Sequence, residues 1–304
     1  MTITLEHMYW LTGLLLFVFA FLTLKDNAHQ HRLGTAAFWG LYGLTFCFGK
    51  MVPGWVTGLA VVAMTVLATL KLLSTGDYHS STPEAKKASA DRYGNKLLLP
   101  TLVIPLVIFL VVVFTKMGAL VGLGLGAIAS LIAAFLLTHD SLGVAMDEGR
   151  RLTDAVSWAI ILPQFLAALG ALFAKAGVGN VVADLVTAHV PVDSKLAVII
   201  AYCLGMALFT IIMGNAFAAF AVITSGIGIP LVVQQYGADP AIVGVLGMLA
   251  GYCGTLVTPM AANFNLVPSA LLEISDRYGV IKAQLPLAVT MLCVQIALMY
   301  ILAF

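Results

Sequence analysis

The residues best suited to chemistry in this 304-residue chain lie in the stretch 251–269, which reads GYCGTLVTPMAANFNLVPS. Hydroxyl and amide side chains, interrupted by glycine and proline, stand here among long apolar runs. Unsatisfied polar groups are very costly in hydrocarbon, so a lipid-facing segment cannot have this composition. Irregular backbone at membrane depth is tolerated only where it is buried in protein or lines a cavity. The stretch therefore predicts a solute site inside a membrane protein.

Two further stretches have the same character. The first, 162–184, carries Pro163 and Gln164 near its start and a GVGN break at 177–180. The second, 211–230, has Gly214 and Asn215 within an apolar run and a TSGIGIP break near its end. Broken helices expose N–H groups at a positive dipole end, which suits an anion, and free carbonyls, which suit a cation such as sodium. Secondary transporters build substrate sites in this way.

The same residues have a structural alternative, in which glycines permit close helix packing and amides bridge neighbouring helices. We adopt this alternative for the GLGLG run at 122–126, while both interpretations stay open for Gly214–Asn215 taken alone and for Gln164. Two amides, two hydroxyls and a proline within eleven residues exceed what packing requires. We expect no catalytic residue and no metal ligand. The expected substrate- or ion-binding residues are Gln164, Gly214, Asn215, Thr255, Thr258, Pro259, Asn263 and Asn265.

The elements that must position these residues follow from composition. Hydrophobic residues make up 61% of the chain and charged residues 10%, against about 25% charged in soluble domains. The expected fold is an all-α, polytopic integral membrane protein with about ten hydrophobic segments, some of them half-helices or re-entrant hairpins. The segments are Met8–Leu24, Thr35–Phe48, Trp55–Leu73, Leu97–Thr115, Gly118–Thr138, Trp158–Phe173, Leu196–Met213, Ala216–Val233, Ile242–Leu256 and Leu285–Phe304.

Loops predict the organisation of these segments. We expect three transmembrane helices in 1–73, a cytoplasmic polar loop in 74–96 and a transport core in 97–304, with 97–115 and 118–138 forming an antiparallel pair and 139–157 lying at the surface. The positive-inside rule places the N-terminus outside. The outer side then receives only Lys50 and Lys116. The cytoplasmic side receives Lys25, Arg32, Lys71, Lys86, Lys87, Arg92, Lys96, Arg150 and Arg151.

Missing motifs narrow the function. The chain has no GxxxxGKS/T phosphate loop and no HExxH zinc motif, and its six histidines fall in predicted loops or near the termini. Ser225 has no histidine partner in the membrane, and a net charge of +1 gives no reason to expect nucleic acid. The four cysteines are expected to be small core residues. No Asp or Glu stands centrally in an apolar run, so coupling to sodium is favoured over a carboxylate proton relay, although proton coupling stays open.

Three runs resemble known transporters. They read LAALGALFAKAGVGNVVADLV, IIMGNAFAAFAVITSGIGIP and GTLVTPMAANFN. Together they are similar to the C-terminal half of the ion-transporter superfamily, which includes the gluconate, C4-dicarboxylate and citrate permeases. The whole chain resembles more closely the bacterial membrane family called domain of unknown function 979. That resemblance implies one subunit of a transporter for 5-oxoproline (pyroglutamate), encoded beside a smaller membrane partner. Such permeases carry two pseudo-symmetric halves, whereas this chain shows a single set of broken-helix motifs.

The function expected from these observations is that of a secondary-transporter subunit in the bacterial inner membrane. Its solute is a small organic anion, 5-oxoproline or a related carboxylate, and its partner is a second, smaller membrane subunit, with a homodimer as the lesser option. No organic cofactor is expected beyond a coupling Na⁺ or H⁺. The alternative is a non-transporting protein, either a structural partner of another permease or a membrane enzyme.

Overall fold

The computed structural model describes residues 3–76, 78, 83–272 and 274–304, and these residues form helices and connecting segments without any strand. The chain divides into two compact units, Met1–Ala155 and Val156–Phe304. Each unit is described separately below. The division into 1–73, 74–96 and 97–304, which rests on hydropathy and polarity rather than on compactness, stays a prediction.

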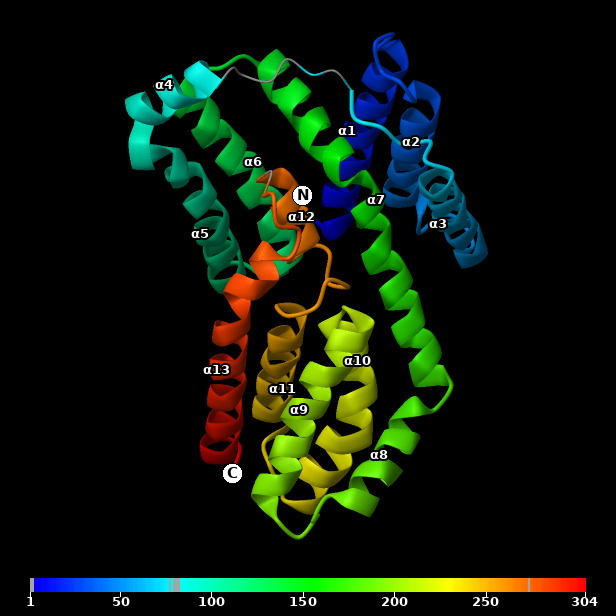
Figure 1. Ribbon diagram of the computed structural model, residues 1–304, viewed down its shortest axis with the longest axis vertical. Coiled ribbons are helices and arrows are strands. Elements are labelled where there is room, and N and C mark those ends of the chain that lie inside the picture. Colours follow the sequence, from blue (N-terminus) through cyan, green and yellow to red (C-terminus); the bar gives the residue numbers. More distant parts are fainter. Residues whose placement is uncertain (1–2, 77, 79–82, 273) are drawn as a thin grey trace. The chain divides into compact units, whose positions relative to one another are not determined.

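The first unit is built from helices that follow the predicted apolar runs closely (Figure 1). The region 74–96, predicted as a loop, contains a helix in its second part because Pro83–Tyr93 is rich in good helix formers such as alanine and lysine. The elements are α1 (Leu5–Lys25), α2 (Arg32–Phe48), α3 (Gly54–Thr69), α4 (Pro83–Tyr93), η1 (Gly94–Leu98), α5 (Leu99–Phe114), α6 (Ala119–Thr138) and the first part of α7 (Leu142–Lys175).

Helices α5 and α6 form the predicted antiparallel pair. A Cβ atom on Gly122 would lie 3.1 Å from Cα of Ile108, and one on Gly126 would lie 3.0 Å from the carbonyl oxygen of Ile104. The contacted residue on α5 moves back from Ile108 to Ile104 as the residue on α6 moves forward from Gly122 to Gly126, so the two helices are antiparallel. The glycines of the GLGLG run therefore serve close helix packing, as predicted.

The second unit is arranged around α9, which packs against α10, α11, α13 and η2. Its core is formed by α9 side chains such as Tyr202 and Met206 together with Val222 and Ile223 from α10. In Figure 1, α9, α10 and α11 lie side by side. The elements of this unit are the second part of α7, α8 (Val178–His189), α9 (Lys195–Met213), α10 (Ala216–Ile223), η2 (Thr224–Gln235), α11 (Pro240–Thr255), α12 (Leu266–Leu271) and α13 (Gly279–Leu302).

Two of the predicted interruptions in this unit are sharp breaks at glycines with positive φ. Gly177, with φ of 73°, separates α7 from α8, and Gly214, with φ of 69°, separates α9 from α10. The predicted break at 224–230 is wrong, because the helix continues there in π-helical turns. Pro163, predicted to open a segment, lies inside α7.

The predicted count of about ten hydrophobic segments is not confirmed. Some apolar runs form helices too short to cross a bilayer: α3 has 16 residues, or about 24 Å of helix, against a hydrocarbon core of about 30 Å. Within the described residues, six helices are long and apolar enough to span, or seven if the two parts of α7 make one span. The fold is therefore all-helical and has the helices of a multi-pass membrane protein. The six are Leu5–Lys25, Lys87–Phe114, Ala119–Thr138, Lys195–Met213, Ala216–Gln235 and Gly279–Leu302.

Candidate functional site

Two interruptions of the helical backbone meet in the second unit. One is Gly214–Asn215 between α9 and α10, and the other is the non-helical loop between α11 and α12. A Cβ atom on Gly214 would lie 2.6 Å from the main-chain carbon and oxygen of Met260, so the two segments are in direct backbone contact. The Thr258 hydroxyl donates a hydrogen bond of 2.8 Å to the carbonyl oxygen of Ile211, near the end of α9. The glycine therefore permits this close approach, and the threonine hydroxyl links the loop to the end of α9.

Asn215 caps the broken helix at this meeting point. Its Oδ1 accepts hydrogen bonds from the main-chain N–H groups of Phe217 at 2.9 Å and Ala218 at 3.3 Å. These bonds satisfy two of the donors that every helix start leaves free. The Nδ2 group of Asn215 has no hydrogen-bond partner among the described residues, which leaves it as a donor for a bound solute.

Asn265 holds the loop between α11 and α12, the second of the two interruptions. The side chain is fully buried, and its Nδ2 donates to the carbonyl oxygens of Thr255 at 2.8 Å and Thr258 at 2.7 Å. Its Oδ1 is buried without a hydrogen-bond partner among the described residues. One amide therefore binds the last carbonyl of α11 and a carbonyl of the loop that follows it.

A cavity of about 240 Å³ lies where the two interruptions meet. Its polar lining comes from asparagine and threonine, which can both donate and accept hydrogen bonds. Its aromatic wall comes from Tyr252, whose ring packs against Phe217 and Phe264 with centroids 6.2 Å apart in each pair. Such a site can hold a small polar solute without a charged side chain. The lining residues are Pro163, Leu166, Gly214, Asn215, Ala216, Phe217, Tyr252, Thr255, Met260, Ala262, Asn263 and Phe264.

The predicted site residues fall into three groups in the structure. Gly214, Asn215, Thr255 and Asn263 line the cavity. Thr258 and Asn265 are buried and bind backbone carbonyls beside it. Gln164 and Pro259 are exposed and do not belong to the lining, whereas Pro163 next to the glutamine does. Sequence reasoning missed the aromatic wall, because Phe217, Tyr252 and Phe264 are indistinguishable from ordinary apolar residues in their segments.

Comparison with known proteins gives the chain its family. The profile of the family described as "Protein of unknown function (DUF979)" matches residues 6–304. The chain belongs to the DUF979 family. No curated protein and no solved structure matches it. The predicted resemblance to this family is thus confirmed, whereas the relationship to the ion-transporter superfamily stays a prediction.

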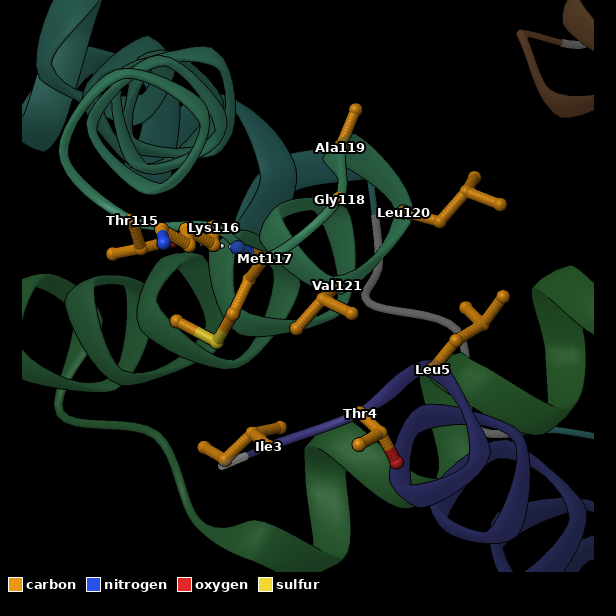
Figure 2. A pocket seen from close by; sticks show the side chains of 10 residues that line it. All are labelled: Ile3, Thr4, Leu5, Thr115, Lys116, Met117, Gly118, Ala119, Leu120 and Val121. Carbon is orange, nitrogen blue, oxygen red and sulfur yellow. Dashed lines mark hydrogen bonds between the residues drawn. The ribbon is translucent and has the colours of Figure 1, made fainter. Parts of the chain in front are cut away.

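The DUF979 chain has a larger cavity in its first unit, but of a different character. About 860 Å³ lies between the start of α1 and the turn that joins α5 to α6. Figure 2 shows the side chains of Ile3, Met117 and Val121 around this space. Its lining is dominated by aliphatic groups, and it lacks the convergent amides of the smaller cavity. We therefore place the candidate site in the second unit.

A buried polar cluster in the first unit was missed by sequence reasoning. The side chain of Asp154, on α7, is only 1% exposed. One of its oxygens accepts a hydrogen bond of 2.7 Å from the indole Nε1 of Trp39 on α2, and the other accepts one from the Tyr78 hydroxyl. His29 Nε2 lies 3.5 Å from the same carboxylate, and the His29 side chain is fully buried. The cluster thus joins residues far apart in sequence.

This cluster corrects one prediction about the DUF979 chain. The segment 139–157 was expected at the surface, yet Arg150 and Asp154 are buried. Helix packing, and not the local apolar run, decides their burial. Burial of the Tyr78 phenol, reinforced by its hydrogen bond to Asp154 and by that negative charge, raises the pKa of Tyr78 well above its ordinary value.

Across residues 3–76, 78, 83–272 and 274–304, no group of three or more His, Cys, Asp or Glu side chains is arranged to hold a metal ion. The four cysteines are free thiols, and Cys203 and Cys253 are buried among apolar neighbours.

Proposed function

We infer that this protein is a subunit of a secondary transporter for a small organic anion, in the class of 5-oxoproline or a related carboxylate. One observation carries the proposal: two interruptions of transmembrane-type helices meet at a cavity lined by Asn215, Thr255 and Asn263. Broken helices that surround a polar cavity are the usual construction of substrate sites in secondary transporters.

The chemistry of the cavity suits a solute that carries both a carboxylate and an amide. Asn215 presents its amide NH₂ at the start of α10, where the helix dipole is positive and favours an anion. Asn263 and Thr255 add groups that donate or accept hydrogen bonds to a lactam or a carboxylate. The ring of Tyr252 offers an apolar face for the carbon skeleton. 5-Oxoproline carries a carboxylate, a lactam amide and an apolar ring skeleton, so it matches these three parts of the lining.

Coupling and assembly belong to the same proposal. Main-chain carbonyls released at the end of α11 suit a dehydrated sodium ion, with a proton as the other coupling ion. Alternating access usually requires one structural repeat to move against another, and this chain shows one set of broken helices. We therefore propose a second, smaller membrane subunit as the partner, in the bacterial inner membrane, with the N-terminus outside.

Uptake measurements test this proposal. Cells that express the chain together with the membrane protein encoded beside it should accumulate radiolabelled 5-oxoproline. Asn215→Ala and Asn263→Ala should each lower uptake about tenfold or more, because a hydrogen bond to a charged group contributes about 1.5–3 kcal/mol. The matched control is Asn180→Ala, which removes an exposed amide on α8 outside the cavity. Wild-type uptake by either cavity variant at normal membrane levels would refute the assignment of the site.

The role of the partner has its own test. Expressed alone, the chain should be inactive in uptake of 5-oxoproline and related carboxylates. Saturable transport by the purified single chain in liposomes would show that the two-subunit proposal is wrong while leaving the cavity intact as a substrate site.

A further inference from the structure

The large cavity of the first unit lies between the starts of two helices that are long enough to span a membrane. Its volume of about 860 Å³ falls within the range of about 300–1,000 Å³ that is typical of ligand pockets. Figure 2 shows Ile3, which leads into α1, across this space from Met117 and Val121 at the start of α6. The two helices are in contact beside the cavity, since an added Cβ on Gly124 would lie 2.3 Å from Met8 Sδ. The cavity is thus bounded by α1 and α6 within one compact unit.

The length of α6 places this cavity level with lipid head groups. The helix has 20 residues, or about 30 Å, which equals the hydrocarbon thickness of a typical bilayer. A span that fits the hydrocarbon begins at one of its two faces. The turn 115–118, which precedes α6 and lines the cavity, therefore lies at the boundary between acyl chains and head groups. Membrane lipid has direct access to such a position.

The walls of the cavity suit hydrocarbon better than a polar solute. Most of the lining side chains are aliphatic. The hydroxyl groups among them are already engaged, since Thr4 Oγ1 lies 2.7 Å from His7 Nδ1. The Thr115 hydroxyl likewise donates to the carbonyl oxygen of Val111. An acyl chain needs no hydrogen bond, whereas a polar solute would lose its hydrogen bonds to water without replacement.

One cation lies at the edge of this apolar space. Of the described residues that line the cavity, Lys116 alone carries a charge, and it is exposed. No acidic side chain in the described part of the chain forms an ion pair with it. Glu6, in the first turn of α1, is paired with Lys50 instead. An apolar cavity with an unpaired cation at its edge is complementary to a molecule that has an apolar chain and an anionic head.

We propose that this cavity binds an anionic phospholipid, with part of one acyl chain in the apolar space and the phosphate beside Lys116. The ammonium group and the phosphate form a charge-assisted contact. The positive end of the α6 dipole lies in the same turn and adds to the attraction. A zwitterionic phospholipid also carries a phosphate, but the cation of its own head group offsets that charge. The site therefore prefers a lipid with a net negative charge.

A protein partner fits this cavity less well. An apolar side chain from another chain would fill the space but would provide no anion for Lys116. A phospholipid provides both parts in one molecule and is present wherever the protein is embedded in a membrane. The preference between two phospholipids that share their acyl chains and differ in head group therefore distinguishes these occupants.

Photolabelling of the full chain in lipid vesicles tests the proposal. The vesicles consist of phosphatidylcholine with a small fraction of phosphatidylglycerol that carries a diazirine on one acyl chain. After illumination, mass spectrometry should find adducts on cavity residues such as Met117 and Leu120. A phosphatidylcholine probe with the same diazirine chain should label them about fivefold less, the factor that corresponds to one basic residue at a membrane surface. Equal labelling by the two probes, or no adduct at these residues, would overturn the proposal.

Gly118→Leu fills the cavity without straining the backbone. The residue has φ of −73°, and an added Cβ would meet no atom within 4 Å. Labelling by the phosphatidylglycerol probe should fall to the level of the phosphatidylcholine probe or below. The matched control Gly58→Leu adds the same side chain at an exposed position of α3 that is equally open, and it should be labelled like the wild type. Undiminished labelling of the Gly118 variant would show that the lipid does not occupy the cavity.

Lys116→Gln isolates the contribution of the charge. This variant keeps a long polar side chain, so the acyl chain should still enter, but the two probes should label the cavity equally. The control Lys96→Gln removes an exposed lysine of η1 that does not line the cavity, and it should retain the preference for phosphatidylglycerol. An intact preference in Lys116→Gln would refute the proposed contact. These readouts do not depend on uptake, so they are independent of the proposed transport function.

Discussion

The cavity of the second unit and the buried cluster of the first unit both place polar groups in an apolar protein, but by opposite means. The cavity uses neutral amides and hydroxyls where helices are interrupted, and there Asn215 is half-buried and Asn263 is exposed. The cluster uses ionisable side chains from helices and turns, and Asp154 and His29 are fully enclosed. Neutral groups leave room for a ligand to complete their hydrogen bonds, whereas buried charges must be completed by the protein itself. The first arrangement suits binding, and the second suits tethering.

The largest expected effect comes from removing the charge at the centre of the cluster. Asp154→Ala leaves the Trp39 indole, the Tyr78 hydroxyl and His29 without their shared acceptor. We expect a loss of about 3–5 kcal/mol in stability, the usual effect of breaking a buried charged network. The measurement is the fraction of detergent-solubilised protein that stays monodisperse after heating. Asp184→Ala, at an exposed position of α8, is the matched control and should behave like the wild type. A wild-type thermal profile for the Asp154 variant would show that the cluster does not tether the helices, and the contrast with the cavity would be wrong.

Gly214→Ala should have the next largest effect, this time on the cavity. The residue has φ of 69°, and a new Cβ would lie 2.6 Å from the main chain of Met260. Strain of this kind costs about 1–3 kcal/mol, and the loop that carries Met260 must also shift, so uptake should fall along with thermal stability. Gly205→Ala is the control on the same helix, since its Cβ would meet Ile223 at an ordinary 3.4 Å. Equal behaviour of the two variants would show that the two interruptions do not need to be in contact.

Variants of Asn265 and Asn263 distinguish a residue that supports the cavity from one that contacts the solute. Asn265→Ala leaves the Thr255 carbonyl without its side-chain donor and the Thr258 carbonyl with only the 3.3 Å bond from the Ala261 N–H, so we expect a loss of about 1–3 kcal/mol in stability. Asn263→Ala, at an exposed position, should leave stability within about 0.5 kcal/mol of the wild type. Thermal unfolding and solute uptake measured on both proteins distinguish the roles. The distinction fails if Asn263→Ala proves the less stable of the two.

The smallest effect is expected at a pair that belongs to neither region. The hydrogen bond from Lys282, together with one from the main-chain N–H of Tyr278, holds the pKa of Asp276 below its usual range. A lowered carboxyl pKa stabilises the fold only above the unfolded value and is lost as pH falls through the folded value. Because this pair is exposed, Lys282→Ala should leave the thermal profile at pH 7 indistinguishable from that of the wild type. A clear loss at neutral pH would show that exposed charges matter here as much as the buried cluster.

Four of the eight residues predicted to bind a substrate or ion line one cavity, since neutral polar residues stand out within apolar runs. Gly214, Asn215, Thr255 and Asn263 were all expected at the site and all line the cavity. Their orientation could not be predicted, because the loop between α11 and α12 has no regular period. Asn265 therefore points into the protein, while Asn263, two residues earlier, does not.

The same reasoning missed the cluster for the converse reason. His29, Tyr78 and Asp154 each lie in a locally polar segment, where one-dimensional patterns predict solvent exposure. Their burial depends on contacts between residues more than 70 positions apart. The available signal was the indole N–H of Trp39 within an apolar helix, since a buried tryptophan usually requires an acceptor.

The predicted membrane orientation can be tested at the polar loop 74–96. The loop around Ser80 and Ser81, which the positive-inside rule assigns to the cytoplasm, lies outside the described residues. Orientation is therefore best tested by labelling single cysteines at these two positions with an impermeant reagent applied to intact cells. Modification by reagent applied from the outside would show that the predicted orientation is wrong.

The glycine contacts between α5 and α6 have a consequence for how the chain is made. The two helices are joined by a turn of a few residues, and their contact needs only partners that are close in sequence. Loop closure over so short a distance is fast and costs little entropy. The pair can therefore form as soon as both helices have left the ribosome and entered the membrane, before the second unit has been synthesised. Bulky residues at Gly122 and Gly126 should then reduce the yield of inserted protein rather than its activity once folded.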